Sequence, residues 1–454
     1  MLDRLRSMID GVRADFVDIR YEVKTETLVE FVGDEIKNVG SNRTDGYVVR
    51  VGRDGGFSSA TVTREKDVPR ALQLASEGAG TIVATGGKEI RLAEVPVVSE
   101  KVNLRLDGDP REVSIDDKIT LTRKYDRLML DQPGIETTRI SYRETGRDKY
   151  YVNSEGTSVS EELLTTNIAG EVIAKRGDLV QNVRVAIGGA DGYDRLMDRD
   201  EKFLERALIA GRLLDAEPVR GGTYDVVLNP NLAGVFTHEA FGHFSEADII
   251  EDNPSLREKM SLGARLGSEA VTIVADSTIP GQLGYYRFDD EGVAVMPVTL
   301  MDRGVLTGRL HSRSTARGFG EPVTGHAVAE DMRFEPIVRM GTIFIRPGEN
   351  SLEELLEMMG DGLYLLDGKG GQTSGENFTF GAQYGFVVKD GIIGPMVRDI
   401  NIMGNLFTTL GSIEAVSDEM ELSESGGCGK GQLNIKSALG GPSVLIRGMV
   451  VGGA

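Results

Sequence analysis

The sequence predicts an α+β protein of two domains, both built on antiparallel β-sheets with flanking helices, with the C-terminal domain the richer in strands. Two observations carry this prediction. Glycine accounts for 58 of the 454 residues and proline for only 14, a composition that favours many tight turns over disorder. Strand and helix patterns also follow one another without a regular βαβ rhythm.

The N-terminal domain is expected to span residues 1–217 and to open with a short helix and an antiparallel meander. An apolar stripe predicts a helix over residues 2–12. Alternating apolar and polar residues predict strands at 17–24, 28–32, 36–39, 46–51 and 57–62, and further strands between 137 and 185. Helical periodicity appears over residues 66–77, 115–130 and 199–214. The Pro218 and Gly221-Gly222 region marks the boundary.

The C-terminal domain, residues 218–454, is expected to consist mainly of strands. Residues 224–228 form the first, and Asn229-Pro230 then supplies a cap and a first-turn proline for a helix that carries His238. Further strands are predicted at 270–275, 293–301, 309–311, 338–345 and 377–380, with a hairpin turning at Asp390-Gly391. A helix over 352–359 has Ser351 and Glu354 at capping-box spacing and ends at Gly360.

Composition and charge exclude several classes of partner and location. The net charge of −20 argues against a nucleic-acid-binding protein, because such surfaces are basic. The single cysteine cannot form an internal disulfide, which fits a reducing compartment and predicts a cytoplasmic protein. No run of 18 or more apolar residues and no signal-like N-terminus is found, so we expect no membrane association.

The strongest chemical signal is a pair of histidines around a glutamate. Only four histidines occur, and His238-Glu239-Ala240-Phe241-Gly242-His243 holds two of them. The usual zinc-protease motif spaces its histidines four apart, on one helix face. A spacing of five turns them about 140° apart on a regular α-helix. Either a π-bulge absorbs the extra residue, or the helix ends at Gly242 and His243 lies on the following loop.

Two imidazoles leave a catalytic zinc site short of a third protein ligand. Cys428, the one cysteine, lies in the glycine-rich segment Gly426-Gly427-Cys428-Gly429-Lys430. There we expect Lys430 to lower the pKa of the thiol. His238, His243 and Cys428 would then complete a His2Cys set for one Zn²⁺. Glu239 would take a proton from the attacking water and pass it to a leaving amine.

Other polar clusters are interpreted as structural. His311 and His326 stand alone and are not expected to be ligands. The acidic run Asp289-Asp290-Glu291 could bind a cation, but a role in capping a turn is the favoured interpretation. The segment Gly368-Lys369-Gly370-Gly371 lacks the G-K-[ST] signature of a P-loop.

Five segments resemble one known family. They are His238 to His243 with Glu246 and Asp248, Phe288-Asp289-Asp290-Glu291-Gly292, Gly370-Gly371-Gln372-Thr373 with Ser374-Gly375, Met403-Gly404-Asn405, and Cys428-Gly429-Lys430-Gly431-Gln432. In these segments the chain resembles the TldD/PmbA family of metalloproteases. The PmbA branch, also called TldE, lacks the H-E-x-x-x-H segment, so the chain resembles the metal-bearing TldD type.

The resemblance implies a zinc peptidase for small or unfolded peptides, with His238, His243 and Cys428 as ligands and Glu239 as base. It also implies a cytoplasmic dimer, formed either with a second copy or with a PmbA/TldE-type paralogue. Two alternatives stay open. One is a non-catalytic peptide-binding or modulator subunit, and the other is an amidohydrolase for small molecules that uses the same site. The sequence does not identify substrate-binding residues.

Overall fold

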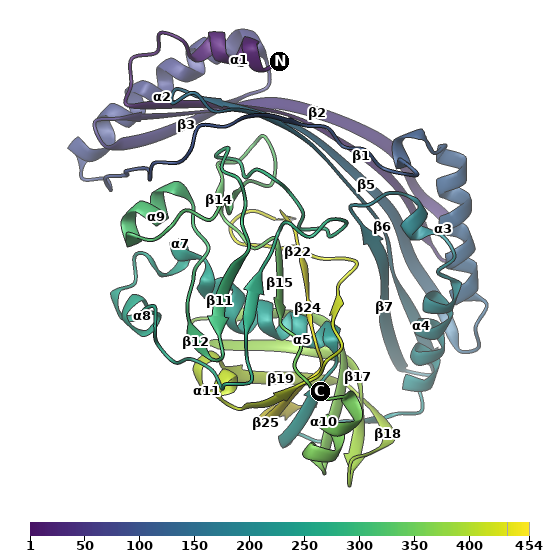
Figure 1. Cartoon of the computed structure of the whole chain (residues 1–454). Helices are drawn as coiled ribbons and strands as arrows, with labels where there is room; N and C mark the ends of the chain where they lie inside the picture. The colour runs from purple at the N-terminus through teal and green to yellow at the C-terminus, as the bar shows by residue number, and fades with distance from the viewer. Residues whose placement is uncertain (434, 454) are drawn as a thin grey trace.

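The computed structural model describes residues 1–433 and 435–453 and confirms the α+β class. A seven-stranded sheet from the N-terminal part of the chain curves over the remainder (Figure 1). Its order is β3-β2-β1-β5-β6-β4, and β7 also pairs with β6. The strands are β1 (Phe16–Val32), β2 (Glu35–Arg53), β3 (Gly56–Val62), β4 (Ser99–Val102), β5 (Ile135–Asn153), β6 (Ser158–Arg176) and β7 (Leu179–Gly189).

The antiparallel meander at the start of the chain is confirmed, but its strands are longer than predicted. The segments 17–24 and 28–32 belong to one strand, because β1 pairs with β2 on one side and with β5 on the other through residues 24–28. Polar residues there interrupt the apolar alternation without interrupting the backbone ladder. A ladder on both sides keeps such a segment extended.

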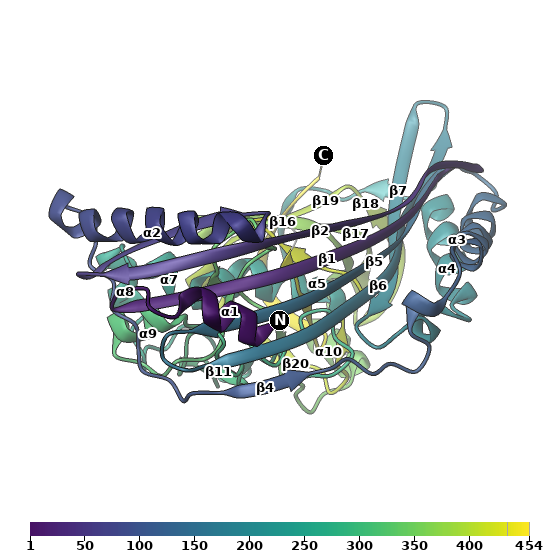
Figure 2. The same cartoon turned by 90° about the horizontal axis from the view of Figure 1, so that it is seen from above.

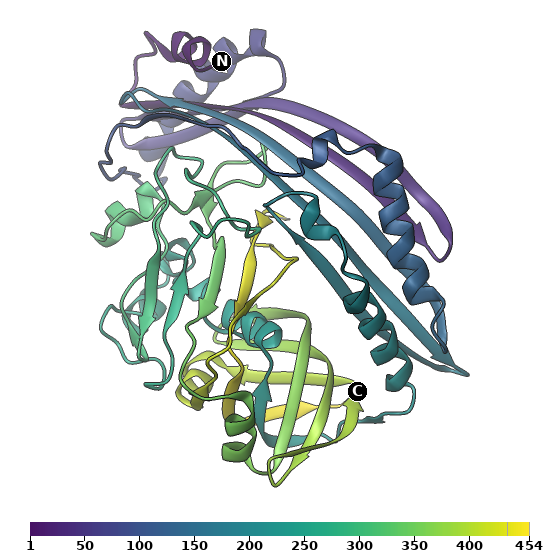
Figure 3. The same ribbon diagram turned by 45° about the vertical axis from the view of Figure 1, so that its right-hand side comes forward.

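Four helices cover the outer face of this sheet (Figures 1, 2 and 3). They are α1 (Leu2–Ile9) and α2 (Val68–Ile82) at one end, and α3 (Ile115–Leu130) and α4 (Asp200–Leu213) at the other. The Ser114 side chain accepts a hydrogen bond from the Asp117 backbone N–H and so begins α3 where predicted. Tyr125 of α3 stacks on Phe203 of α4 with ring centroids 4.2 Å apart, which joins the two helices over the sheet.

The C-terminal part contains two larger sheets. The first has the order β12-β11-β10-β15-β24-β21, formed by β10 (Ile273–Ala275), β11 (Val298–Asp302), β12 (Val305–Leu306), β15 (Thr342–Ile345), β21 (Glu421–Leu422) and β24 (Ala438–Gly441). The second runs β16-β9-β25-β19-β17, and an extra β16–β17 pairing closes it into a barrel. Its strands are β9 (Gly222–Leu228), β16 (Gly362–Ser374), β17 (Asn377–Lys389), β19 (Ile400–Asn405) and β25 (Val444–Gly452).

Short elements complete this part of the chain. β18 (Ile392–Arg398) and β8 (Glu217–Pro218) extend the barrel sheet, and β20 (Ile413–Val416) pairs with β25. Two small ribbons pair β13 (Ala327–Val328) with β14 (Ile337–Val338) and β22 (Gly427–Cys428) with β23 (Ile435–Lys436). The helices are α5 (Pro230–Thr237), the π-helix His238–Gly242, α6 (His243–Ser245), α7 (Ala247–Ile250), α8 (Pro254–Lys259), α9 (Arg313–Phe319), α10 (Leu352–Met359) and α11 (Leu406–Gly411).

Several predicted C-terminal elements are confirmed and others are wrong. The capping box of Ser351 and Glu354 begins α10, and the β17–β18 hairpin turns at Asp390-Gly391. The strand predicted at 293–301 is limited to 298–302, and 309–311 forms only an isolated bridge at Leu310. Some neighbouring strands in this part are parallel rather than antiparallel, among them β9 with β16 and β15 with β24. The division of the chain near residue 217 stays a prediction.

The acidic run Asp289-Asp290-Glu291 joins the two parts of the molecule. Asp289 caps a turn, as predicted, by accepting hydrogen bonds from the N–H groups of Glu291 and Val293. Asp290 and Glu291 instead reach the large sheet, where Asp290 pairs with Arg20 at 3.5 Å and Lys149 at 3.3 Å, and Glu291 pairs with Arg50 at 3.0 Å. All three carboxylates are buried, so breaking one pair would leave an uncompensated charge.

The helix that leads into the histidine motif is held between the six-stranded sheet and the barrel (Figure 1). Asn229 caps α5 by accepting from the Leu232 N–H. Gly234 of α5 faces Gly440 of β24 so closely that a Cβ on Gly234 would lie 2.5 Å from the Gly440 nitrogen. Two glycines therefore set the distance between helix and sheet.

No helix among the described residues is both long enough and apolar enough to span a bilayer.

We expect Gly234→Ala to lower the free energy of unfolding by about 1–3 kcal/mol, because the new methyl group meets backbone that cannot move aside. Gly80→Ala in α2 is the matched control. Its Cβ meets nothing nearer than 3.6 Å, so higher helix propensity should raise stability by up to about 1 kcal/mol. Urea unfolding of both variants checks the difference, and equal changes in the two would contradict the close approach.

Candidate metal centre

A π-turn places the two motif histidines together. His238 to Gly242 form a π-helix between α5 and α6, and His243 is the first residue of α6. This is the first of the two predicted arrangements, and the alternative of a loop after Gly242 is wrong. The wider turn offsets the extra residue of the five-residue spacing. The two imidazole rings lie with centroids 4.9 Å apart and planes at 77°.

Cys428, the third predicted ligand, lies beside the two histidines although it is 185 residues beyond His243 in the sequence. Its Sγ lies 3.1 Å from His238 Nε2 and 3.5 Å from His243 Nε2. The ligating atoms of His238, His243 and Cys428 all lie within 4.8 Å of one another. Within residues 1–433 and 435–453, no other group of three or more His, Cys, Asp or Glu side chains is placed to hold a metal ion.

The spacing of these atoms suits a tetrahedral metal ion. Zinc binds histidine nitrogen at about 2.0–2.1 Å and cysteine sulfur at about 2.3 Å, which places tetrahedral ligands about 3.5 Å apart. Of the two observed contacts, 3.5 Å matches that value and 3.1 Å is slightly shorter. Imidazole with thiolate is a donor set that suits zinc better than magnesium or calcium.

The protonation of the cysteine follows from its neighbours. Burial raises the pKa of the Cys428 thiol, but hydrogen bonds with His238 and His243 outweigh burial and bring the pKa to about 6. For His243 the directions are reversed. Burial lowers the pKa of this imidazole, but its contacts with Cys428 and Glu246 outweigh burial and raise the pKa to about 10. A thiolate is therefore favoured at neutral pH, and the thiolate is the form that binds metal.

Behind His243 lies a buried carboxylate that fixes its ring. His243 Nδ1 is 3.0 Å from Glu246 Oε2, which leaves Nε2 directed at Cys428. Lys430 Nζ lies 3.2 Å from Glu246 and 2.8 Å from Asp248. Lys430 was expected to act on the thiol; the structure corrects this, because its ammonium is bound to the two carboxylates instead. A carboxylate behind a ligand imidazole is a common support of metal sites.

Glu239 is positioned by the barrel strand β16. The Thr373 hydroxyl lies 2.6 Å from the Glu239 carbonyl oxygen and 3.0 Å from its Oε2. A Cβ on Gly371 would lie 2.7 Å from Glu239 Cγ, so a glycine is required there. The sequence marked Gly371 and Thr373 only through the resemblance and gave no sign that they contact Glu239.

The loop that carries Cys428 is held at two further points. Arg339, fully buried, donates to the carbonyl oxygens of Cys428 at 2.6 Å and Lys430 at 3.3 Å. Glu424 accepts two hydrogen bonds from Arg199 of the α4 region, at 2.8 Å and 2.7 Å, and one from Lys202. The N-terminal part of the chain therefore helps to position the cysteine.

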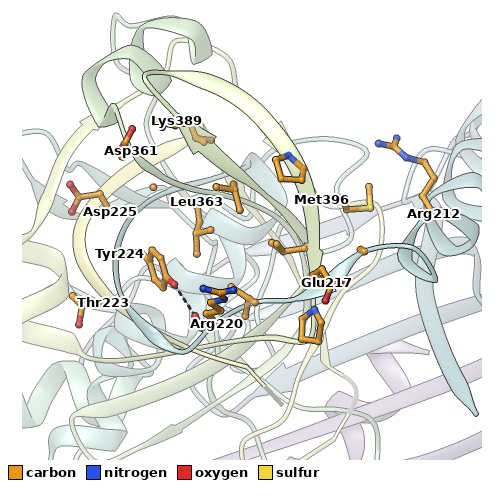
Figure 4. Close-up of a pocket in the computed structure, with 18 of the residues that line it drawn as sticks. Arg212, Glu217, Arg220, Thr223, Tyr224, Asp225, Asp361, Leu363, Lys389 and Met396 are labelled. Carbon is orange, nitrogen blue, oxygen red and sulfur yellow. Dashed lines mark hydrogen bonds between the residues drawn. The ribbon is translucent and has the colours of Figure 1, made fainter.

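The other candidates lie apart from this group. His311 bonds to Thr315 and Glu321, while His326 is completely buried beside Thr324. A separate cavity of about 1030 Å³ opens where β8 and β9 meet the β17–β18 hairpin, and none of His238, His243 and Cys428 lines it (Figure 4). At this cavity the Tyr224 hydroxyl donates a hydrogen bond to the Arg220 carbonyl oxygen at 2.9 Å (Figure 4).

The fold and the donor set together define an α+β protein with a candidate His2Cys metal centre. Comparison with known families agrees. Three models of the PmbA/TldA metallopeptidase family match the chain: domain 1 over residues 17–79, the central domain over 108–215 and the C-terminal domain over 221–453. The chain therefore belongs to the PmbA/TldD family of metallopeptidases.

Relatives in this family resemble the chain over nearly its whole length. A protein of Synechocystis named a metalloprotease is 37% identical over 444 residues, which is 97% of this chain and 95% of that protein. A Saccharolobus solfataricus protein named zinc metalloprotease TldD homolog is 29% identical and covers 97% of each chain.

Solved structures share the fold at low sequence identity. A Thermotoga maritima protein described as a candidate modulator of DNA gyrase gives a TM-score of 0.80 at 21% identity, covering 99% of this chain and 98% of that one. TldE from Thermococcus kodakarensis gives 0.78 at 18% identity and covers 99% of both.

We expect Glu424→Gln to lower the free energy of unfolding by about 1–3 kcal/mol near neutral pH, the usual contribution of hydrogen bonds to a charged group. Burial raises the pKa of Glu424, but Arg199 and Lys202 outweigh it and lower the pKa from 4.5 to about 2. The wild-type advantage is therefore complete above about pH 4.5 and is lost as the pH falls toward 2.

Urea unfolding at pH 7 and pH 3 checks this pH dependence. Asp215→Asn, which breaks the exposed pair with Arg176, is the control and should change stability less. A Glu424→Gln deficit as large at pH 3 as at pH 7 would contradict the assignment.

Proposed function

We propose that this protein is a zinc-dependent peptidase that cleaves small or unfolded peptides. In this proposal His238, His243 and Cys428 hold one Zn²⁺ and Glu239 is the general base. The observation that carries it is the grouping of three ligating atoms within 4.8 Å of one another, with Glu239 next to His238 in the π-turn. Membership in a metallopeptidase family supports the reaction class, and the name of the Saccharolobus relative supports zinc.

The chain's own groups account for the proton transfers. Bound zinc supplies Lewis acidity, which lowers the pKa of water and polarises a carbonyl oxygen. Glu239 accepts the proton of the attacking water at a carboxylate oxygen and delivers it to the leaving amine as the peptide bond breaks. The Thr373 hydroxyl binds Glu239 Oε2 and restrains the carboxylate during both transfers. Glu246 holds the His243 ring in one orientation.

The free edge of β16 supports a peptide as the substrate. Beyond Leu365, where its pairing with β9 ends, β16 is paired only with β17 among the described residues. Residues 370–374, which carry this free edge, lie next to Glu239, since the face of the strand that bears Gly371 and Thr373 meets that residue. An extended peptide could add to this edge through main-chain hydrogen bonds, which confer affinity with little side-chain selectivity.

We also propose that the protein works in the cytoplasm and pairs with a second chain, either a copy of itself or a PmbA/TldE-type paralogue. Support for the second chain comes from the shared fold with a protein solved as TldE. The single buried cysteine supports a reducing compartment, because metal binding needs its thiol unoxidised.

We expect about one zinc per wild-type chain, with cleavage of an unstructured peptide mixture that chelation abolishes and zinc restores. Glu239→Gln should retain the zinc and lose activity by about 100-fold or more, the usual contribution of a general base. Cys428→Ala and His238→Ala should lose zinc and activity together. Metal analysis and a peptide assay, with and without an added paralogue, check these outcomes.

Each other outcome identifies a different error. Zinc without cleavage, even with the paralogue present, would indicate the alternative of a non-catalytic binding subunit. Full zinc content in Cys428→Ala would remove the cysteine from the ligand set. Cleavage of small amides but not of peptides would favour the amidohydrolase.

We expect Gly371→Ala to reduce kcat by about tenfold or more with zinc content unchanged, because small displacements of a catalytic group are costly. The added methyl group would overlap Glu239 Cγ. Gly411→Ala, where a Cβ meets nothing within 4 Å, is the control. Steady-state kinetics with metal analysis check this prediction, and a normal kcat in Gly371→Ala would contradict the role of β16.

A further inference from the structure

A small cavity lies between the large sheet and the metal centre. It has a volume of about 70 Å³ and is bounded by β5 and β6 on one side and by the segments around Tyr285, Arg339 and β23 on the other. Whole ligands usually occupy about 300–1,000 Å³. This space is therefore suited to one side chain or a chain end.

The cavity adjoins the candidate metal site through shared walls. Arg339 lines it and also donates to the Cys428 carbonyl oxygen. Met340 lines it too, and a Cβ on Gly242 of the π-turn would lie 2.3 Å from the Met340 sulfur. Ile435, a third wall residue, pairs with Cys428 across the β22–β23 ribbon.

Four cationic side chains line this cavity, and three of them have protein partners. Arg147 pairs with Glu22 at 2.7 Å, and Lys149 pairs with Asp290 at 3.3 Å. Arg339 donates to two backbone carbonyls of the cysteine loop. The fourth, Lys436, makes no side-chain hydrogen bond or ion pair with any described residue.

The surroundings of Lys436 do not compensate its charge. Its side chain is partly buried, and burial lowers the pKa of its ammonium. Arg143 and Lys24 nearby add repulsion, and Glu26, a carboxylate that favours the charged form, already pairs with Lys24 at 3.1 Å. Partial burial of a cation without a counter-charge carries a desolvation penalty. An anion that entered the cavity would remove that penalty.

We propose that Lys436 binds a carboxylate of the substrate in this cavity. The inference rests on the proposed peptidase function and extends it to a substrate class: peptides with an Asp or Glu side chain, or the terminal carboxylate, close to the bond that is cut. A carboxylate fits the small volume and accepts the hydrogen bonds that an ammonium donates. The other three cations already have protein partners and therefore do not compete for the ligand.

Binding is measured first, in the zinc-loaded Glu239→Gln background, by fluorescence anisotropy. One series of labelled peptides replaces Gln by Glu at each position in turn, and a second compares a free C-terminus with its amide. We expect one position, or the free terminus, to bind about tenfold tighter, and Lys436→Gln to abolish that difference. Lys389→Gln removes an exposed lysine that does not line this cavity and should preserve it.

Cleavage by the Glu239-intact enzyme separates the two hypotheses. If wild type cleaves peptides with no acidic or terminal preference in kcat/KM or in binding, the carboxylate site is wrong and the peptidase stands. If no peptide is cleaved but the preference in binding exists and depends on Lys436, the peptidase is wrong and the site stands. A preference that survives Lys436→Gln overturns the assignment to this residue.

Thermal unfolding tests whether Lys436 instead has a structural role. Lys436→Met keeps the apolar stem and removes the charge, so Tm should stay the same or rise. A lysine that served in an ion pair would instead give a lower Tm on substitution. That result would overturn the proposal.

Discussion

The π-turn at His238 to Gly242 is the constraint on which the candidate site depends, since histidines five residues apart diverge on an ordinary helix. The turn is set by contacts on both sides. Before it, α5 is fixed by its Asn229 cap and by the approach of Gly234 to Gly440. After it, Gly242 lies against the Met340 sulfur, where any side chain would overlap. One packing arrangement therefore fixes the position of α5, the width of the π-turn and the direction of both imidazole rings. Cys428 completes the group only because both rings face it.

The large N-terminal sheet contributes to this site although it holds none of the three ligating residues. Its buried cations Arg20, Arg50 and Lys149 bind the carboxylates of Asp290 and Glu291. The α4 region binds Glu424, four residues before Cys428. These contacts fix the sheet against the barrel and the six-stranded sheet, and the concave face of the sheet then closes the cavity beside the metal centre. The charges buried at this junction are therefore of both signs and are paired with one another.

Local chemistry was predictable from the sequence, and tertiary choices were not. Caps such as Ser114, Ser351 and Asn229 act within four residues, so their helices begin where predicted. The grouping of His238, His243 and Cys428 followed from residue types alone. The choice between a π-turn and a loop did not, because it depends on Met340, nearly a hundred residues away. The predicted effect of Lys430 on the thiol is wrong for a similar reason, because its partners Glu246 and Asp248 come into contact with it only in the folded chain. Barrel closure by β16 and β17 likewise needs strand pairing that periodicity does not report.

The number of donors at the centre bears on whether a bound metal would be structural or catalytic. Structural zinc is usually closed by four protein ligands, whereas catalytic zinc keeps a position for water or substrate. Within the described part of the chain the group contains three ligating side chains. The two nearest motif carboxylates have other partners: Glu246 is bound by His243 and Lys430, and Glu239 by Thr373. Glu246 meets His243 at Nδ1, whereas Cys428 lies at Nε2 of the same ring, so this carboxylate lies behind the ligand ring. A tetrahedral ion held by this set would therefore keep one coordination position for water, and that position is what hydrolysis by the proposed mechanism requires.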